Sequence, residues 1–215
     1  MDLINPVVQQ YAEQLTTAED PLLKEISDYT LQHHPEAVML SGHLQGKVLE
    51  MISTIVQPKR ILEIGTFTGY SALCLAKGLA EDGLLFTIES REEDANLARS
   101  YFDRSPYAAQ IVLHKGMAAN IIPTLKESWD LVFIDADKPS YIQYFNLIFP
   151  NLRKNGVILA DNIFFHGHVL PGSSPGNGGK SAKGIREFND YISQRTDIER
   201  VALTIRDGLY LIRKL

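Results

Sequence analysis

The sequence predicts an α/β fold with a doubly wound, seven-stranded and mostly parallel sheet, preceded by N-terminal helices and ending in an antiparallel hairpin. Three observations lead to this prediction. From residue 60 onward, short apolar segments of strand length alternate with amphipathic segments of helical length. A turn with two glycines joins the first of these strands to the helix that follows. Only the turn Arg206-Asp207-Gly208 separates the last two apolar segments, which is typical of a hairpin.

Hydrophobic periodicity and turn residues place the individual elements. Strands are expected near residues 60–64, 84–89, 110–114, 130–134, 155–160, 198–204 and 208–213. Helices between them are expected near residues 69–80, 92–104, 117–126, 140–152 and 182–194. No internal repeat or composition shift divides the chain, so we expect a single domain over residues 1–215, with 1–57 as a helical cap and 58–215 as the sheet core.

The helical cap contains two clear helical patterns. One helix begins at Asp20-Pro21, because proline suits the first helical turn, and ends before Pro35. Its expected core-facing side chains are Leu22, Ile26, Tyr29 and Thr30. The other helix spans 43–56, with Leu44, Val48, Leu49 and Ile52 as its expected core-facing side chains. Residues 39–42 have no clear period and are expected to form a loop near the ligand edge of the sheet.

Composition narrows the class of protein. The 215 residues are 45% hydrophobic and 22% charged, as is ordinary for a globular protein in water. The net charge of −5 gives no electrostatic case for a nucleic-acid partner. No apolar run reaches the length of a membrane span, and the first residues do not resemble a signal peptide. The single cysteine, Cys74, excludes an intrachain disulfide and fits a buried side chain, so we expect a cytoplasmic protein without a membrane partner.

The glycine turn indicates a nucleotide-like ligand. Glu63, Gly65 and Gly69 form the pattern E-x-G-x-x-x-G at the end of the first strand. A dinucleotide site needs G-x-G-x-x-G, and Phe67 stands where its second glycine would be. We expect Phe67 to obstruct a pyrophosphate, which disfavours an NAD-linked oxidoreductase. The amino acid part of S-adenosylmethionine needs no such close approach.

Glu89 strengthens this interpretation. It ends the second expected strand, twenty residues after Gly69, where an acid can accept both ribose hydroxyls. The alternative is a Rossmann-like sheet whose acids merely face solvent. We favour S-adenosylmethionine as the cofactor because Glu63, Gly65, Gly69 and Glu89 occur together.

Oxygen-bearing side chains also follow two later strands. Asp135, Asp137 and Lys138 come after the strand at 130–134, and Asp161 and Asn162 end the strand at 155–160. Parallel strands that leave the sheet at one edge bring such residues together, beside the glycine turn. Asp135, Asp161 and Asn162 then offer only oxygen ligands, which suit Mg²⁺, with Ca²⁺ or Mn²⁺ as alternatives. Taken alone, each cluster could instead form a turn or a helix cap.

The loop after these residues carries two weaker signals. Gly179-Lys180-Ser181 resembles part of a phosphate loop, but that motif needs a glycine where Ser174 stands, so we expect a surface loop and a helix capped by Ser181. His166 and His168 are spaced like a ligand pair. We expect them to be solvated, because the oxygen ligands suffice without them.

Three motifs together resemble those of the cation-dependent O-methyltransferases, the family of catechol and caffeoyl-CoA O-methyltransferases and their bacterial relatives. They are EIGTFTGYS at 63–71, FIDADK at 133–138 and Asp161-Asn162. The resemblance extends from about Pro35 to Leu215. It implies a metal-dependent transfer of the methyl group of S-adenosylmethionine to a catechol-like acceptor, and a homodimer.

The resemblance also implies roles for individual residues. Asp135, Asp161 and Asn162 would hold the metal. Lys138, three positions after Asp135, would be the catalytic lysine, and Asp135 would be the second catalytic residue. The cofactor would lie among Ser41, Glu63, Gly65, Thr66, Gly69, Ser71, Glu89, Ala118, Asp135 and Asp137. As a general base Lys138 would need a neutral amine, and we expect the charge of the cation to lower its pKa.

Two other functions stay open at this stage. Some bacterial proteins of this type methylate a hydroxylated uridine of tRNA, and the net charge of −5 argues weakly against that acceptor. A module that binds the cofactor without turnover is the other alternative, and the presence of Asp135, Lys138, Asp161 and Asn162 speaks against it. The segment 163–184 differs freely among relatives, so the natural acceptor does not follow from it.

Overall fold

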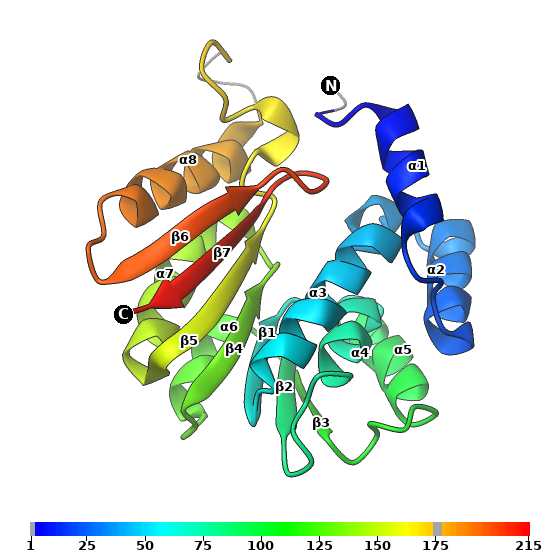
Figure 1. The fold of residues 1–215 in the computed structure, drawn as a ribbon. Coiled ribbons are helices and arrows are strands. Elements are labelled where there is room, and N and C mark those ends of the chain that lie inside the picture. The colour runs from blue at the N-terminus through cyan, green and yellow to red at the C-terminus, as the bar shows by residue number, and fades with distance from the viewer. Residues whose placement is uncertain (1–2, 174–177) are drawn as a thin grey trace.

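A seven-stranded sheet in the order β3-β2-β1-β4-β5-β7-β6 forms the centre of the computed structural model, which describes residues 3–173 and 178–215 (Figure 1). The strands β1 to β5 are parallel, and β7 pairs antiparallel with both β5 and β6. Their bounds are β1 Arg60–Ile64, β2 Leu84–Glu89, β3 Ile111–Lys115, β4 Trp129–Ile134, β5 Leu152–Asp161, β6 Ile198–Leu203 and β7 Leu209–Lys214. The predicted fold class is therefore confirmed.

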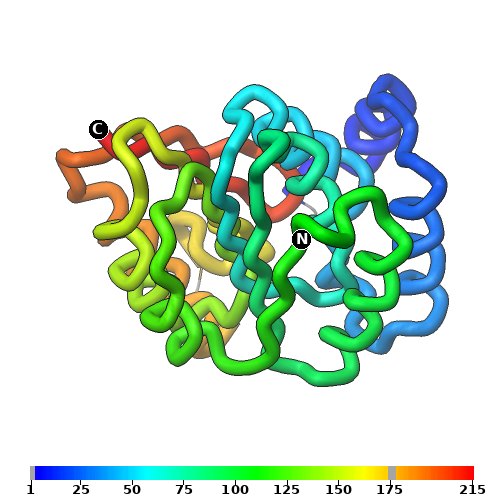
Figure 2. The backbone as a smooth tube through the Cα atoms, turned by 90° about the horizontal axis from the view of Figure 1, so that it is seen from below, coloured from blue at the N-terminus to red at the C-terminus, as the bar shows by residue number. Residues whose placement is uncertain are grey.

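Helices cover both faces of this sheet, and Figure 2 shows the layers from below. Three helices precede the sheet in the chain: α1 Pro6–Leu15, α2 Pro21–His33 and α3 Gly42–Val56. The helices of the alternating part are α4 Tyr70–Ala76, α5 Glu92–Phe102, α6 Ala118–Ile121, α7 Tyr141–Ile148 and α8 Gly179–Ser193. Short 3₁₀ turns lie at 37–39, 122–124, 138–140, 149–151 and 165–167.

Several predicted helices are shorter in the structure, and glycine and proline explain why. The helix expected at 117–126 becomes a 3₁₀ turn at Pro123, and the one expected at 140–152 changes in the same way at Pro150, because proline lacks the N–H that an α-helix needs. Helix α4 ends at Ala76. Shortly after it, Gly78 touches the backbone of Ser53 so closely that an added Cβ would lie 2.1 Å from a carbonyl carbon.

The helical cap begins as predicted but packs differently. Asp20 caps α2 by accepting a hydrogen bond from the backbone N–H of Leu23. Tyr29, predicted to face the core, is exposed. In α3 the buried residues are Gln45, Gly46, Leu49 and Ser53, whereas the predicted Leu44, Val48 and Ile52 are only half-buried. The apolar spacing thus located the helix but missed its most buried face, which is partly polar.

The carboxyl ends of β1 and β4 approach each other with unusual closeness. At the end of β1, Gly65 has φ +100°, and a Cβ on it would lie 2.3 Å from the carbonyl oxygen of Asp135. Only glycine fits there without moving the backbone of β4. The glycine turn and the acidic cluster after β4 are therefore adjacent parts of one edge.

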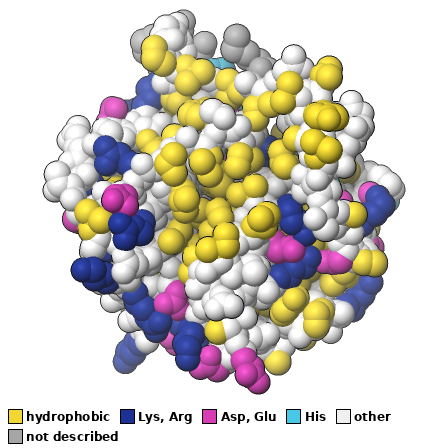
Figure 3. Space-filling model, viewed as in Figure 1, with side chains coloured by type: hydrophobic (Ala, Val, Ile, Leu, Met, Phe, Trp, Pro, Cys, Tyr) yellow, Lys and Arg dark blue, Asp and Glu magenta, His cyan; other side chains and the backbone are white. Residues whose placement is uncertain are grey.

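One face of the sheet is only partly covered near β6 and β7. Hydrophobic side chains gather there between these strands and α3, as Figure 3 shows in the view of Figure 1. Met51 and Ile55 of α3 and Val201 of β6 are 57%, 78% and 46% exposed. Among the described residues, no helix combines the length and the apolar character needed to cross a bilayer.

Candidate active site

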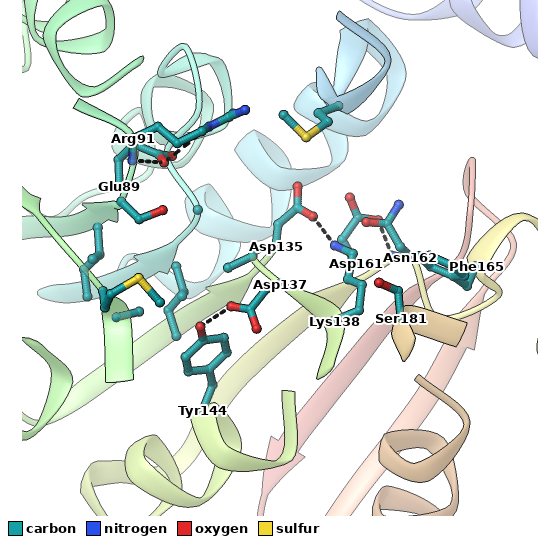
Figure 4. A pocket seen from close by; sticks show the side chains of 18 of the residues that line it. Glu89, Arg91, Asp135, Asp137, Lys138, Tyr144, Asp161, Asn162, Phe165 and Ser181 are labelled. Carbon is teal, nitrogen blue, oxygen red and sulfur yellow. Dashed lines mark hydrogen bonds and ion pairs between the residues drawn. The ribbon is translucent and has the colours of Figure 1, made fainter. Parts of the chain in front are cut away.

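A pocket of about 500 Å³ opens at the carboxyl edge of the parallel strands (Figure 4). The predicted site residues that line it are Gly65, Glu89, Ala118, Asp135, Asp137, Lys138, Asp161 and Asn162. They come from the ends of β1, β2, β4 and β5 and from the start of α6, so the sheet edge brings together residues spread over about a hundred positions in the chain. The structure therefore brings the three predicted metal residues, Lys138 and five of the ten predicted cofactor residues to one cavity.

On the β2 side, the backbone fixes the carboxylate of Glu89. Its Oε2 accepts a hydrogen bond from the N–H of Phe67 at 2.8 Å, and its Oε1 accepts one from the N–H of Arg91 at 2.9 Å. Each oxygen keeps a further lone pair for a ligand in the pocket. This arrangement suits recognition of a pair of hydroxyl groups.

The ring of Phe67 does not perform the role expected of it. It lies against His34 and Arg91 and does not line the pocket. The predicted obstruction of a pyrophosphate by this ring is therefore wrong in its geometry. The positive φ of Phe67 (+49°) instead directs its N–H to Glu89, so the residue acts through its backbone.

The other five predicted cofactor residues lie behind the pocket wall. They are Ser41, Glu63, Thr66, Gly69 and Ser71. Glu63 is fully buried and accepts hydrogen bonds from the hydroxyls of Ser71 at 2.6 Å and Thr87 at 2.5 Å. Burial raises the pKa of Glu63 to about 8, although these two hydroxyls oppose the shift. Thr66 also hydrogen-bonds to the hydroxyl of Thr87, so Glu63, Thr66 and Ser71 tie the two ends of the glycine turn to β2.

On the β4 side, Asp135 and Lys138 form an ion pair inside the pocket. Lys138 Nζ donates to Asp135 Oδ1 at 2.8 Å and to the hydroxyl of Tyr141 at 2.9 Å. Burial raises the pKa of Asp135 to about 6, against the influence of Lys138 and with that of Asp161. Burial alone would lower the pKa of Lys138, but Asp135, Tyr141 and Asp161 together raise it. In the protein alone, Lys138 is thus held as an ammonium.

Asp161 and Asn162 complete the cluster from the end of β5, and each has a polar partner that the sequence did not reveal. Asp161 Oδ2 accepts a hydrogen bond from Gln45 Nε2 at 2.7 Å, and its Oδ1 accepts one from the N–H of Asn162 at the same distance. Asn162 Nδ2 points to Asp207 Oδ2 over 3.4 Å. Because Asp207 can only accept, the amide oxygen of Asn162 is left to face the pocket.

The tip of the C-terminal hairpin also reaches this edge. Arg206 Nη1 donates to the carbonyl oxygens of Leu40 at 2.7 Å and Ser41 at 2.5 Å. Asp207 Oδ1 accepts from the N–H of His166 at 2.6 Å. Two residues of one turn therefore hold both the loop before α3 and the loop after β5.

The loop after β5 differs from its prediction at one residue. Helix α8 begins at Gly179 behind a glycine N-cap, Gly178, so the predicted cap at Ser181 is wrong. Ser181 lines the pocket instead. His166 lines it as well but is 60% exposed, and His168 does not line it. Ser174, which decided against a phosphate loop, lies outside the described residues.

Comparison with known proteins gives the family. A sequence model described as O-methyltransferase matches residues 13–215. The chain is 32% identical over 200 residues to a catechol O-methyltransferase of Niastella koreensis, covering 91% of this chain and 89% of that one. It is 27% identical to a caffeoyl-CoA O-methyltransferase of Petunia hybrida, with 90% and 83% covered.

The chain belongs to the O-methyltransferase family.

Solved structures agree with this assignment. The O-methyltransferase TomG of Streptomyces achromogenes, in complex with S-adenosylmethionine, is 31% identical and superposes with a TM-score of 0.86 over 97% of this chain and 96% of that one. An O-methyltransferase of Bacillus cereus in complex with S-adenosylhomocysteine is 28% identical, with a TM-score of 0.84 and 97% of each chain covered. This O-methyltransferase thus uses S-adenosylmethionine as its methyl donor.

The donor set of this O-methyltransferase fits a hard divalent cation. No group of three or more His, Cys, Asp and Glu side chains with metal-binding geometry occurs in the described part of the chain. A cation would therefore rely on two carboxylates, Asp135 and Asp161, and on the amide oxygen of Asn162. All three side chains point toward the same part of the pocket in Figure 4. They offer oxygen only, as Mg²⁺ prefers.

We expect Glu89→Ala to weaken binding of S-adenosylmethionine by roughly 1–3 kcal/mol, because charge-assisted hydrogen bonds to the ribose hydroxyls are lost. Titration calorimetry at fixed salt measures the change. Glu93→Ala, on the exposed first turn of α5, is the matched control and should bind like wild type. Equal affinity of Glu89→Ala and wild type would place Glu89 outside the cofactor site.

Proposed function

We propose that this enzyme methylates one hydroxyl of a small catechol-like acceptor with the help of a divalent cation, with Mg²⁺ as the first candidate. The observation that carries the proposal is the shared pocket. It is lined by the oxygen donors Asp135, Asp161 and Asn162, by the half-buried Lys138 and by Glu89, the acid expected to bind the ribose. A donor, a cation and a nucleophile could therefore meet in one place.

The shape of the pocket supports an aromatic acceptor. Apolar side chains such as Met39 and Phe165 line the pocket together with its polar residues, and Phe165 lies beside Asn162 in Figure 4. An aromatic ring would therefore find apolar contacts in the same cavity. The names of the relatives in Niastella koreensis and Petunia hybrida point in the same direction, to a catechol and to caffeoyl-CoA.

Methyl transfer from a sulfonium needs an acceptor oxygen that is at or near the anionic state. A bound divalent cation would lower the pKa of two adjacent hydroxyls and fix their orientation. Lys138 would then accept the proton of the reacting hydroxyl or stabilise the oxygen anion by charge. Glu89 would hold the ribose, so that the methyl group stays in line with the acceptor.

The ion pair of Lys138 with Asp135 limits these roles. The pKa of Lys138 is raised in the protein alone, so a neutral amine at working pH requires a further positive charge nearby. Lys138 as a general base therefore depends on the cation, whereas Lys138 as an electrostatic partner of the acceptor does not.

We expect EDTA to abolish turnover and to leave binding of S-adenosylmethionine nearly unchanged, because the proposed cation contacts the acceptor. Asp161→Asn should have the same two effects, since it removes a charge from the donor set and keeps the shape of the side chain. Activity assays and calorimetry test this together, with Asp190→Asn on the exposed side of α8 as control. Full activity of a demonstrably metal-free preparation would refute the metal assignment.

We expect Lys138→Met to lower turnover by on the order of 10²–10⁴, the range typical of a lost general base. Binding of cofactor and cation should be nearly intact. If Lys138 removes a proton, the loss should shrink with a nitrocatechol, which is already ionised. Wild type and variant are compared on catechol and nitrocatechol from pH 6 to 10. The control is Lys183→Met, which removes an exposed lysine of α8.

An equal loss on both acceptors at every pH would instead assign Lys138 to holding the substrate or stabilising its charge.

We also propose a homodimer, formed through the apolar surface between α3 and β6. Met51, Ile55 and Val201 are exposed hydrophobic residues of these two elements, and hydrophobic side chains gather on this face of the molecule in Figure 3. Large apolar patches are rarely left uncovered on monomeric proteins. A second copy of the chain is the occupant we propose. Light scattering should give the mass of a dimer for wild type and of a monomer for Ile55→Glu. A monomeric wild type at micromolar concentration would contradict the proposal.

A further inference from the structure

Gln45 is a buried polar residue that the proposed chemistry does not use directly. It lies on α3, outside the sheet, and is 0% exposed. Its Nε2 donates to Asp161 Oδ2 over 2.7 Å, across 116 positions of sequence. Asp161 is itself only 2% exposed, so both partners of this hydrogen bond are shielded from water.

The other end of the same amide is unsatisfied. No described residue forms a hydrogen bond with Gln45 Oε1, although that atom is buried. A buried carbonyl oxygen without a partner destabilises a fold, and an apolar side chain of the same shape would avoid that cost. Stability of the fold therefore does not account for a glutamine at this position. The hydrogen bond from its Nε2 to Asp161 is the feature that an apolar side chain could not supply.

The charges around Asp161 fix which way this amide faces. If the amide were reversed, Oε1 would face a carboxylate oxygen, and two acceptors would repel each other. The amide nitrogen of Gln45 therefore faces Asp161 and donates a hydrogen bond to Oδ2, one of the two carboxylate oxygens. The carboxylate is held in one rotation, since its Oδ1 is also engaged by the N–H of Asn162.

We propose that Gln45 is a positioning residue for the cation site, acting by orienting the carboxylate of Asp161. The inference rests on the proposed function, because it needs a cation at Asp135, Asp161 and Asn162. Gln45 touches neither the cofactor pocket nor the acceptor side, as it is absent from the pocket wall. Partners of this kind commonly change metal affinity by 10- to 100-fold when they are removed.

The test uses Mn²⁺ as the probe, because electron paramagnetic resonance reports the free ion directly and needs no turnover. Gln45→Met keeps a linear side chain of similar size and removes the N–H donor. We expect its Mn²⁺ dissociation constant to rise 10- to 100-fold, while S-adenosylmethionine binds within twofold of wild type. Its melting temperature should fall, because Asp161 Oδ2 loses its donor, although removal of the unpaired Gln45 Oε1 offsets part of that loss. The activity lost at limiting Mn²⁺ should be partly recovered as Mn²⁺ is raised.

Gln110→Met is the matched control. Gln110 also donates through its amide nitrogen, to the carbonyl oxygens of Ala80 and Gly83, but at the opposite edge of the sheet. It should alter stability and leave the Mn²⁺ affinity within twofold. If Gln45→Met does not fold, Gln45→Asn replaces it. The shorter amide cannot reach Asp161 from the same backbone, so the same loss of Mn²⁺ affinity is expected.

Two results would overturn the inference in distinguishable ways. If wild type binds Mn²⁺ and Gln45→Met binds it within twofold, Gln45 has only a structural role and the proposed function is unaffected. If wild type itself does not bind Mn²⁺, the cation assignment fails and this inference fails with it.

Discussion

The close approach of Gly65 to the backbone of Asp135 is the constraint on which the site depends. A side chain on Gly65 would collide with the carbonyl oxygen of Asp135 at 2.3 Å, so β1 and β4 can end side by side only with glycine there. The register of Ile64 against Ile134 then puts the cofactor turn and the first acidic residue at the same level of the edge. Because β5 lies next to β4 in the same direction, Asp161 arrives at that level too.

The residues at this edge could be predicted from the sequence, because their grouping depends only on local strand patterns and on the topology of a parallel sheet. Short apolar runs identify buried strands, and alternation with helices makes them parallel. Parallel strands must end at a common edge, so residues such as Glu89, Asp135 and Asp161 could be grouped before any coordinates were known. The same logic could have found Asp207, because an antiparallel β7 beside β5 must begin where β5 ends, and Leu209 indeed pairs with Asp161.

The orientation of individual side chains could not be predicted where it depends on how one element packs against another. Gln45 stands in a helix whose apolar spacing suggested Leu44 and Val48 as the buried face. Rotation of α3 about its axis is set by its contact with α4, where Gly46 allows Tyr70 to come close, and no periodicity in α3 alone encodes that contact. The ring of Phe67 was misjudged for a related reason, since a positive φ turned its backbone rather than its ring toward the site.

The balance of charge explains how the edge can hold so many acids. Asp161 is buried and Asp135 is half-buried, and the pKa of Asp135 is raised first by this burial and further by the charge of Asp161. In the protein alone, the ammonium of Lys138 neutralises part of this repulsion through its bond to Asp135. If Asp135 and Asp161 hold a divalent cation, as proposed above, its positive charge would offset the same repulsion. The same ion pair holds Lys138 as an ammonium in the protein alone, so a role for Lys138 as a general base would require a further positive charge nearby.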